Sequence, residues 1–454
     1  MKHYFNTLNV SRLTLIVIAF LTYSSVSAQN WFQVGTGTND DVRAFTVYNN
    51  SLVAGGSFTN SGAINANHIA RWDGTSWVAD FGLGLNDDVY ALTVYNGDLI
   101  AAGKFTTTGG GYPVNRIAKW NGTSWLPLGT GMNADIRALT VYNNQLFAGG
   151  YFTVAGGNNL IYIAKWNGTN WSEVGPIGLN SMVYALTVFN GALIAGGEFT
   201  TAGGINAKRI AKWDGANWQP LGQGFANNAA VYALTVQNST LFAGGDFTVS
   251  GSSPVNYIAK WDGLNWIPLG SGMNERVYSL CSSGNELFAT GNFSLADATS
   301  AYRIARWNGT NWQPLGSGLN DAGYALCNFN GGIYVGGAFT NVGGILTAYY
   351  IARWSTITEV TGQTSAPEKF KLYQNYPNPF NPVTKISFDI PKASDVSLTI
   401  YDSQGKEVKS YNYGKLSAGS YSKFFDGNGF SSGVYFYRIN AGDFSQTNKM
   451  MLIK

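Results

Sequence analysis

The sequence predicts an all-β protein in which a seven-bladed β-propeller is followed by a small β-sandwich. First, the tetrapeptide Ile-Ala-(Lys/Arg)-Trp recurs seven times, with a mean period of about 47 residues. Second, each repeat holds four β-rich segments separated by Gly and Asn, as a four-stranded propeller blade would. Third, a different pattern of strands and glycine turns occupies the last part of the chain. The tryptophans that end the tetrapeptides are Trp72, Trp120, Trp166, Trp213, Trp261, Trp307 and Trp354.

The composition agrees with many short strands and tight turns. Glycine contributes 57 of 454 residues, aromatic residues make up 15% and charged residues only 12%, which excludes a disordered chain and a coiled coil. The net charge is +3, and residues 29–355 show no stripe of basic residues. Because binding of phosphates needs clustered Lys and Arg, no nucleic-acid partner is expected.

Residues 1–28 are expected to form a secretory signal peptide. Lys2 and Arg12 precede the apolar run 13–21, and the small residues of Val26-Ser-Ala28 stand before Gln29. The apolar run is about half the ~20 residues that a transmembrane helix needs. No other stretch is long and apolar enough, so no transmembrane segment is expected.

The predicted propeller, 29–355, begins and ends in the middle of a repeat. In chain order, the four segments of a repeat read Val-Tyr-Ala-Leu, Ala-Gly-Gly-x-Phe, Ile-Ala-Lys-Trp and Trp-x-x-Leu-Gly. The region opens with a lone fourth segment at Trp31 and closes with the first three, which end at Trp354. This arrangement predicts that the first strand pairs with the last three and closes a ring.

Two further patterns belong to the repeats. Asp-Gly or Asn-Gly follows six of the seven third segments, as at Asp73-Gly74, which predicts two-residue type I′ hairpin turns. The double glycine 196–197, followed by Trp213 and Trp218, resembles the kelch repeat, although these aromatics are five residues apart instead of the usual six. The resemblance covers 29–355 and implies a kelch-like fold without implying a function.

The composition changes near residue 355. The polar stretch 356–370 is expected to be a linker. Alternating strands such as 386–390 and 396–401, separated by glycine turns, predict a small β-sandwich over 371–454.

The segment 371–454 contains Tyr-Pro-Asn-Pro at 376–379, Ser-Gly-Val-Tyr at 432–435 and an apolar ending closed by Lys454. With these motifs it resembles the type A C-terminal sorting domain of the type IX (Por) secretion system of Bacteroidota. Its body also resembles the immunoglobulin-like module of flagellar hook-capping proteins, and an ordinary Ig-like accessory module is the alternative. The resemblance implies that the type IX machinery recognises the domain in the periplasm, carries the protein across the outer membrane and usually cleaves the domain off. The protein would then stay on the cell surface or be secreted. The matching residues are Tyr376, Pro377, Asn378, Pro379, Ser432, Gly433, Val434, Tyr435, Lys449 and Lys454.

The residue inventory predicts no catalytic residues, no cofactor and no metal site. After removal of the signal peptide only His68 remains, and its variable position in the repeat assigns it a surface or packing role. Zincin sites and galactose-oxidase-like copper sites need more histidines than this. Cys281 and Cys327 occupy matching points of adjacent repeats, expected to be too far apart for a disulfide. Loop acids such as those that follow Asn39 and Asn86 are assigned to turns, with calcium binding as the alternative.

The expected function is therefore a noncatalytic secreted or cell-surface propeller for binding, adhesion or scaffolding, with an unknown glycan or protein ligand. The alternative is a secreted polysaccharide-active enzyme that uses paired carboxylates. The loops between the second and third segments are the least uniform, as at 106–115 and 153–160. These loops are expected to contact the partner.

Overall fold

The computed structural model describes residues 29–226, 229–344, 346–356, 369–416, 419–427 and 429–453. The predicted signal peptide, most of the predicted linker and Lys454 lie outside the described residues. Within these ranges every regular element is a β-strand. The described residues up to Thr356 belong to one compact unit and those from Lys369 onward to another.

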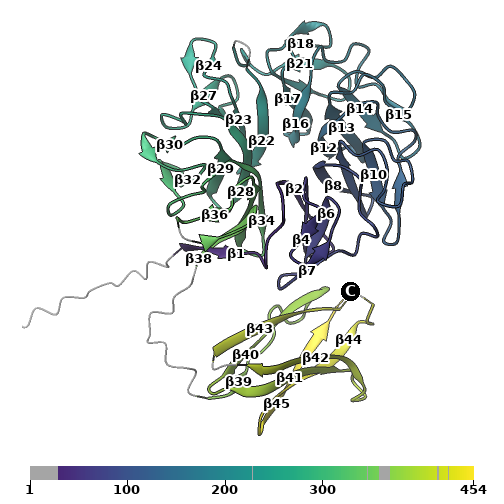
Figure 1. Cartoon of the computed structure of the whole chain (residues 1–454), viewed down its shortest axis with the longest axis vertical. Coiled ribbons are helices and arrows are strands. Elements are labelled where there is room, and N and C mark those ends of the chain that lie inside the picture. The colour runs from purple at the N-terminus through teal and green to yellow at the C-terminus, as the bar shows by residue number, and fades with distance from the viewer. Residues whose placement is uncertain are drawn as a thin grey trace, which may run out of the picture. The chain divides into compact units, whose positions relative to one another are not determined.

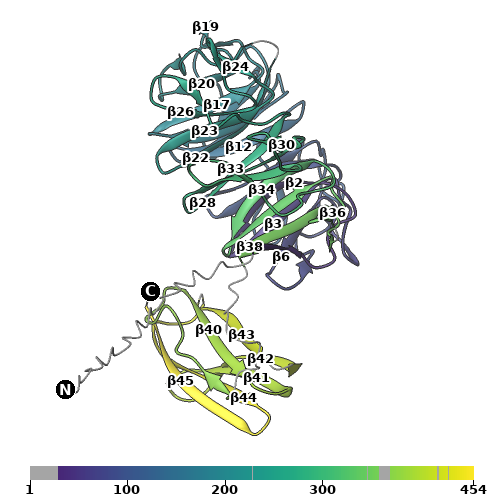
Figure 2. The same cartoon turned by 90° about the vertical axis from the view of Figure 1, so that its left-hand side faces the viewer.

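The first unit consists of seven four-stranded antiparallel sheets arranged as a ring (Figures 1 and 2). We number the sheets as blades 1–7 in the order of their innermost strands. These innermost strands are β2 (Val42–Tyr48), β8 (Val89–Tyr95), β12 (Ile136–Tyr142), β16 (Val183–Phe189), β22 (Val231–Gln237), β28 (Val277–Ser283) and β34 (Gly323–Phe329). Each contacts the innermost strands of both neighbouring blades, and β34 contacts β2, so the ring is closed.

The other strands follow outward in the same order of blades. The second strands are β3 (Ser51–Gly56), β9 (Asp98–Gly103), β13 (Gln145–Gly150), β17 (Ala192–Gly197), β23 (Thr240–Gly245), β29 (Glu286–Gly291) and β35 (Gly332–Gly337). The third strands are β6 (Ile69–Trp72), β10 (Ile117–Trp120), β14 (Ile163–Trp166), β20 (Ile210–Trp213), β26 (Ile258–Trp261), β32 (Ile304–Trp307) and β38 (Ile351–Thr356). The outermost strands are β7 (Trp77–Val78), β11 (Trp125–Pro127), β15 (Trp171–Ser172), β21 (Trp218–Pro220), β27 (Trp266–Pro268), β33 (Trp312–Pro314) and β1 (Gln29–Gln33).

The loops between second and third strands carry short two-stranded ladders in five blades. These ladders pair β4 (Asn60–Ser61) with β5 (Ile64–Asn65), β18 (Thr201–Ala202) with β19 (Ile205–Asn206), β24 (Val249–Ser250) with β25 (Ser253–Pro254), β30 (Leu295–Ala296) with β31 (Thr299–Ser300), and β36 (Asn341–Val342) with β37 (Leu346–Thr347).

The N-terminal strand closes the ring in the way that the incomplete repeats predict. Blade 7 has the order β1-β38-β35-β34, and β1 pairs antiparallel with β38 so that Trp31 lies opposite Trp354. The indole Nε1 of Trp31 also donates to the carbonyl of Leu315 in blade 6, at 3.0 Å. Residues from the two ends of the repeat region therefore complete one sheet.

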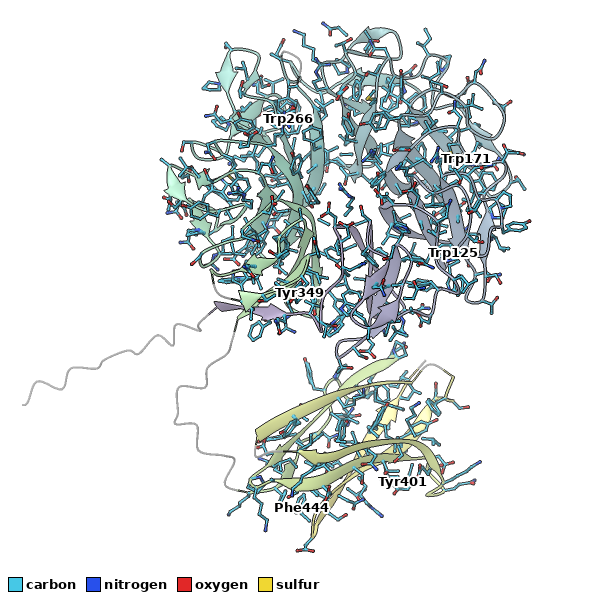
Figure 3. The ribbon with its side chains drawn as sticks, in the orientation of Figure 1. Trp125, Trp171, Trp266, Tyr349, Tyr401 and Phe444 are labelled. Carbon is cyan, nitrogen blue, oxygen red and sulfur yellow. The ribbon has the colours of Figure 1, made fainter. Side chains whose placement is uncertain are left out.

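The same indole hydrogen bond recurs around the whole ring. In every blade the tryptophan of the outermost strand donates from Nε1 to a backbone carbonyl of the preceding blade; Trp77, for example, donates to Val34 at 2.9 Å. Figure 3 shows Trp125, Trp171 and Trp266 in the outer part of the ring. The seven donors are Trp31, Trp77, Trp125, Trp171, Trp218, Trp266 and Trp312. Neighbouring blades are thus joined by hydrogen bonds as well as by apolar contacts.

Close packing explains the paired glycines at the ends of second strands. A Cβ placed on Gly196 would stand 2.6 Å from Cγ1 of Val231 in the next blade. A Cβ on Gly197 would overlap the backbone carbonyl of Met182 in its own blade. Side chains at these positions would push blades apart or break the pairing of β16 and β17.

The prediction of two-residue turns after the third strands is wrong. Trp72 pairs with Trp77, so the four residues 73–76 form the connection. Of these four only Gly74 has a positive φ, at 104°. The Asp73 carboxylate accepts hydrogen bonds from the amides of Thr75 and Ser76, so the side chain satisfies donors that a tighter turn would pair with backbone. Two-residue turns with two positive φ values occur instead between first and second strands, as at Asn96-Gly97.

The second unit consists of two antiparallel sheets that share one core. The three-stranded sheet contains β39 (Lys371–Leu372), β40 (Val383–Ile390) and β43 (Gly419–Asp426). The four-stranded sheet contains β42 (Glu407–Leu416), β41 (Ser394–Tyr401), β44 (Gly433–Ala441) and β45 (Phe444–Leu452). Buried side chains of both sheets, among them Phe388, Leu398 and Met450, form one apolar cluster, so the unit is a two-layer β-sandwich.

Candidate functional site

Seven side chains, one from each blade, surround the axis of the ring. Each is the second residue of an innermost strand, and together they line a cavity of about 220 Å³. A β-bulge at this point in every blade, such as the register shift between Val183 and Ala185, leaves the residue between them outside the regular ladder. Bulges re-aim side chains in this way. The seven residues, called the mouth ring below, are Arg43, Tyr90, Arg137, Tyr184, Tyr232, Tyr278 and Tyr324.

Aromatic contacts run continuously along one side of the mouth ring. The ring centroids of Tyr184 and Tyr232 lie 5.3 Å apart, and each further step, through Tyr278 to Tyr324, is 5.7 Å. On the other side the guanidinium of Arg43 lies 4.8 Å from the centroid of Tyr324. The guanidinium of Arg137 lies 3.8 Å from the centroid of Tyr90. Cations at such distances from an aromatic face are attracted by its quadrupole.

Carboxylates next to the mouth ring accept hydrogen bonds from its tyrosines. The hydroxyl of Tyr90 donates to Asp88 at 2.9 Å, that of Tyr184 to Glu198 at 2.7 Å and that of Tyr232 to Asp246 at 3.0 Å. Burial, followed by the charge of Asp88, raises the pKa of Tyr90 to about 12. Burial likewise raises the pKa of Tyr184, with its hydrogen bonds to Tyr151 and Glu198 adding to the effect, and the pKa of Tyr232, with Asp246 adding to the effect. These tyrosines are therefore neutral donors at physiological pH.

Ion pairs are unevenly distributed around the mouth ring. Asp41 lies 2.7 Å from Arg43, and Asp135 lies 3.3 Å from Arg137. Burial raises the pKa of Asp41 even though Arg43 opposes this. Within the described residues Glu198 has no ion-pair partner.

The loops at this end of the ring are held by a repeated asparagine. The side chain of Asn39 accepts from the amides of Thr59 and Asn60, at 2.9 and 2.8 Å, and so joins two loops of blade 1. Five further asparagines do the same in their own blades: Asn86, Asn133, Asn180, Asn274 and Asn320. The loops 106–115 and 153–160 therefore lie at the end of the ring where the mouth ring opens.

The remaining candidate groups have structural partners. Nδ1 of His68 lies 3.1 Å from the Gly56 carbonyl and 3.8 Å from Asp88 in the next blade. Cys281 and Cys327 are free thiols, and burial raises their pKa to about 11 and about 12. In the part of the chain that the structure describes, no group of three His, Cys, Asp or Glu side chains could hold a metal ion.

In the second unit the predicted motif residues come together at β45. Gly433, Val434 and Tyr435 of β44 pair with residues 450–452, and Phe436 pairs with Lys449. The segment 376–380 lies on the other side of β45: the amide of Phe380 donates to the Met451 carbonyl at 2.9 Å. Three motif blocks that are far apart in the sequence thus form one structure, while Lys454 lies outside the described residues.

The four residues Tyr376–Pro379 form an exposed loop between two buried anchors. Tyr376 is 82% exposed, whereas Asn375 and Phe380 are each 2% exposed. The side chain of Asn378 contributes to holding the loop on β45 by accepting from the Met451 amide at 2.9 Å. Ser432 and Lys449 are also exposed.

Asn375 is a residue that the sequence analysis missed. Its side-chain amide donates to Thr384 at 2.9 Å and to the Pro377 carbonyl at 3.0 Å. Its backbone amide donates to the buried hydroxyl of Tyr437 at 2.8 Å. A buried Asn directly before an X-Pro-x-Pro loop is the signal that could have pointed to this role.

Residues 374–454 match the family described as the secretion system C-terminal sorting domain. This chain carries such a sorting domain. The match confirms the prediction made for 371–454, and the protein is an exported one, either secreted or at the cell surface. In the ranges that the structure describes, no helix could cross a membrane.

Several solved structures resemble the chain at low sequence identity. PorZ of Porphyromonas gingivalis, described as an essential bacterial surface component of the type-IX secretion system, is 14% identical with a TM-score of 0.43. The match covers 93% of this chain but only 60% of PorZ. A Bacteroides thetaiotaomicron protein of unknown function is 9% identical, with a TM-score of 0.34 over 62% of this chain and 72% of its own. An α-L-arabinofuranosidase of Clostridium thermocellum is 14% identical, with a TM-score of 0.24 over 62% of this chain and 95% of its own. No curated protein matches the sequence.

Proposed function

We propose that this protein is a noncatalytic binding protein of the cell surface or the surrounding medium, exported by the type IX secretion machinery. Residues 1–28 take the chain to the periplasm, residues 371–454 address it to the machinery, and the propeller 29–355 is the cargo. The machinery reads the exposed loop Tyr376–Pro379 on one side of β45 together with Ser432–Tyr435 at the start of β44 on its other side. The domain match over 374–454 supports the export part of this proposal.

The mouth ring is the observation that supports binding as the function of the propeller. It gathers five tyrosines and two arginines around one cavity, and its acidic neighbours hold three of the tyrosine hydroxyls in place. Rigid aromatic rings with a few placed polar groups are typical of recognition sites, because they offer large contact area at little entropic cost. The variable loops 106–115 and 153–160 lie at the same end and extend the surface that a partner would contact.

An array experiment tests this role. The mature chain 29–454 would be applied to arrays of glycans and of peptides, beside a Tyr184→Ala/Tyr232→Ala variant. Leu264→Ala is the control, because Leu264 is exposed in a hairpin at the opposite end of blade 5. We expect a defined set of ligands that the control retains and the double variant loses. Equal binding by all three proteins would show that the mouth ring is not the site.

A polysaccharide-active enzyme is the second candidate, and one observation favours it. Asp41 lies beside the mouth ring with a pKa raised by burial, and a general acid needs a raised pKa. Mass spectrometry of glycans recovered after incubation separates the candidates. Shortened glycans that the Asp41→Asn variant no longer produces would establish the enzyme, whereas intact bound glycans support the binding protein.

A further inference from the structure

The mouth ring itself shows what its tyrosine faces attract. At two of its seven positions arginine replaces tyrosine, and both guanidiniums lie against a neighbouring tyrosine, Arg137 on Tyr90 and Arg43 on Tyr324. Each arginine also pairs with a carboxylate of its own blade, Asp135 or Asp41. The arginine positions therefore share one arrangement, in which a cation lies between an aromatic face and a carboxylate.

Blades 4 and 5 repeat this arrangement without the arginine. The rings of Tyr184 and Tyr232 stand 5.3 Å apart at an interplanar angle of 58°. Glu198 and Asp246 lie at their hydroxyls, at 2.7 and 3.0 Å. In the described ranges no guanidinium or ammonium group lies over the ring of Tyr184 or of Tyr232.

The negative charge on this side is only partly balanced. Asp246 has a partner in Arg276, but the closest atoms are 3.8 Å apart and Arg276 is half exposed. Within the described residues the Glu198 carboxylate forms no ion pair and accepts from the neutral hydroxyl of Tyr184, while the guanidinium of Arg209 donates to the backbone carbonyl of Glu198 instead. A carboxylate without a counterion beside two aromatic faces favours a positively charged ligand group.

The width of the mouth ring limits the size of the ligand group that can enter the cavity. Seven side chains at the spacing observed between the tyrosine rings surround the axis at a radius of about 6 Å, which leaves room for one side chain but not for a helix, about 10–12 Å across. The cavity of about 220 Å³ agrees with this limit. The occupant must therefore be a narrow group that projects from a larger partner.

We propose that the Tyr184–Tyr232 face of the mouth ring, with Glu198, binds the guanidinium of an arginine side chain that projects from a protein partner. This inference rests on the proposed binding function and names the ligand chemistry for that same site. The guanidinium lies on the tyrosine faces, as Arg43 and Arg137 do elsewhere in the ring, and supplies the counterion that Glu198 lacks. Planar guanidinium stacks on aromatic rings and pairs with a carboxylate at the same time.

The test uses the mature chain and two small probes of nearly equal shape. Calorimetry would measure the binding of N-acetyl-arginine amide and of N-acetyl-citrulline amide, which lacks the charge. Glu198→Gln is the informative variant, because glutamine keeps an oxygen that can accept the Tyr184 hydroxyl. Glu173→Gln is the control, since it makes the same change at an exposed carboxylate away from the mouth ring.

We expect the arginine probe to bind about tenfold more tightly than the citrulline probe, the size of a charge-dependent aromatic contact. Glu198→Gln should remove most of that difference and Glu173→Gln none of it. Equal affinity for the two probes, no binding of the arginine probe at tens of millimolar, or an unchanged Glu198→Gln variant would each overturn the inference. If the arrays still show ligands that the Tyr184→Ala/Tyr232→Ala variant loses, only the arginine assignment fails. If that variant binds like the parent, the proposed function itself fails.

Discussion

Replacing Trp31 tests whether the N-terminal strand holds the ring closed. The side chain makes three contacts that the sequence alone would not require of a residue so near the N-terminus. Its Nε1 donates to Leu315 in blade 6 at 3.0 Å. Its ring meets that of Trp354 edge to face, with centroids 5.1 Å apart. It also packs against the backbone at Gly316 and Gly343, where an added Cβ would stand within 4 Å of the indole.

The structure sets the size of the expected effect. Truncating a buried tryptophan to alanine costs about 3–5 kcal/mol, and Trp31 is half-buried, so the lower end, about 3 kcal/mol, applies. Unfolding entropy near the melting temperature is about 2.1 cal/mol/K per residue, or roughly 0.7 kcal/mol/K for a unit of this size. Trp31→Ala should therefore lower the melting temperature of the propeller by about 4 °C.

Differential scanning calorimetry of the mature chain measures this shift. Trp31→Phe keeps an aromatic ring and loses the hydrogen bond, worth about 1 kcal/mol, so its melting temperature should fall by about 1.5 °C. Trp125→Phe removes the equivalent bond to Phe81, between blades 2 and 1 and away from the closure, and so gives the reference value for losing one such bond. A Trp31→Ala protein that melts within 0.5 °C of the parent would refute closure by β1. Deleting residues 29–35 goes further, because it exposes the edge of β38, and should cause aggregation.

Three other outcomes are expected. Without residues 371–454 the propeller should fold but stay in the periplasm of its native host, and fractionation measures where it accumulates. The exported form of the full chain should end between residues 355 and 372, which C-terminal mass spectrometry checks. Equal surface delivery of the truncated chain would favour an Ig-like accessory module. Cys281 and Cys327 should react with a disulfide reagent at pH 8 far more slowly in the native protein than in denaturant, because burial raises their pKa and keeps the thiolate scarce; native reaction at the denatured rate would contradict their burial. Hydrogen bonds from backbone amides lower the pKa of Asp214 and Asp262, so their contribution to stability is present above about pH 4 and lost as pH falls through the folded pKa. Acid titration of an Asp214→Asn/Asp262→Asn variant should lose less stability than the parent, since Asn already occupies the equivalent positions Asn121, Asn167 and Asn308; an unchanged acid midpoint would argue against this role.

The sorting domain shows how a site can be recognised in sequence without its geometry being known. Its three motif blocks were identified from the sequence, because each has its own local pattern of proline, glycine or apolar residues. Their meeting at β45 could not be predicted, since nothing local to Phe380 or Met451 specifies a hydrogen bond across more than seventy residues. The anchoring role of Asn375 escaped notice for the same reason: a lone Asn acquires its meaning only when folding buries it.

The propeller also shows which features follow from the sequence and which only the tertiary structure decides. Its repeats determine the strands and the pairing of Trp31 with Trp354, because each blade must bury apolar faces that neighbouring copies supply. The turn after Trp72 was mispredicted, since a side-chain oxygen of Asp73 competes with backbone pairing there. The mouth ring was overlooked because Arg43 and Tyr184 look like ordinary strand residues in sequence. Only closure of the ring, with a bulge at the same point of every innermost strand, brings seven such residues from distant parts of the chain to one axis.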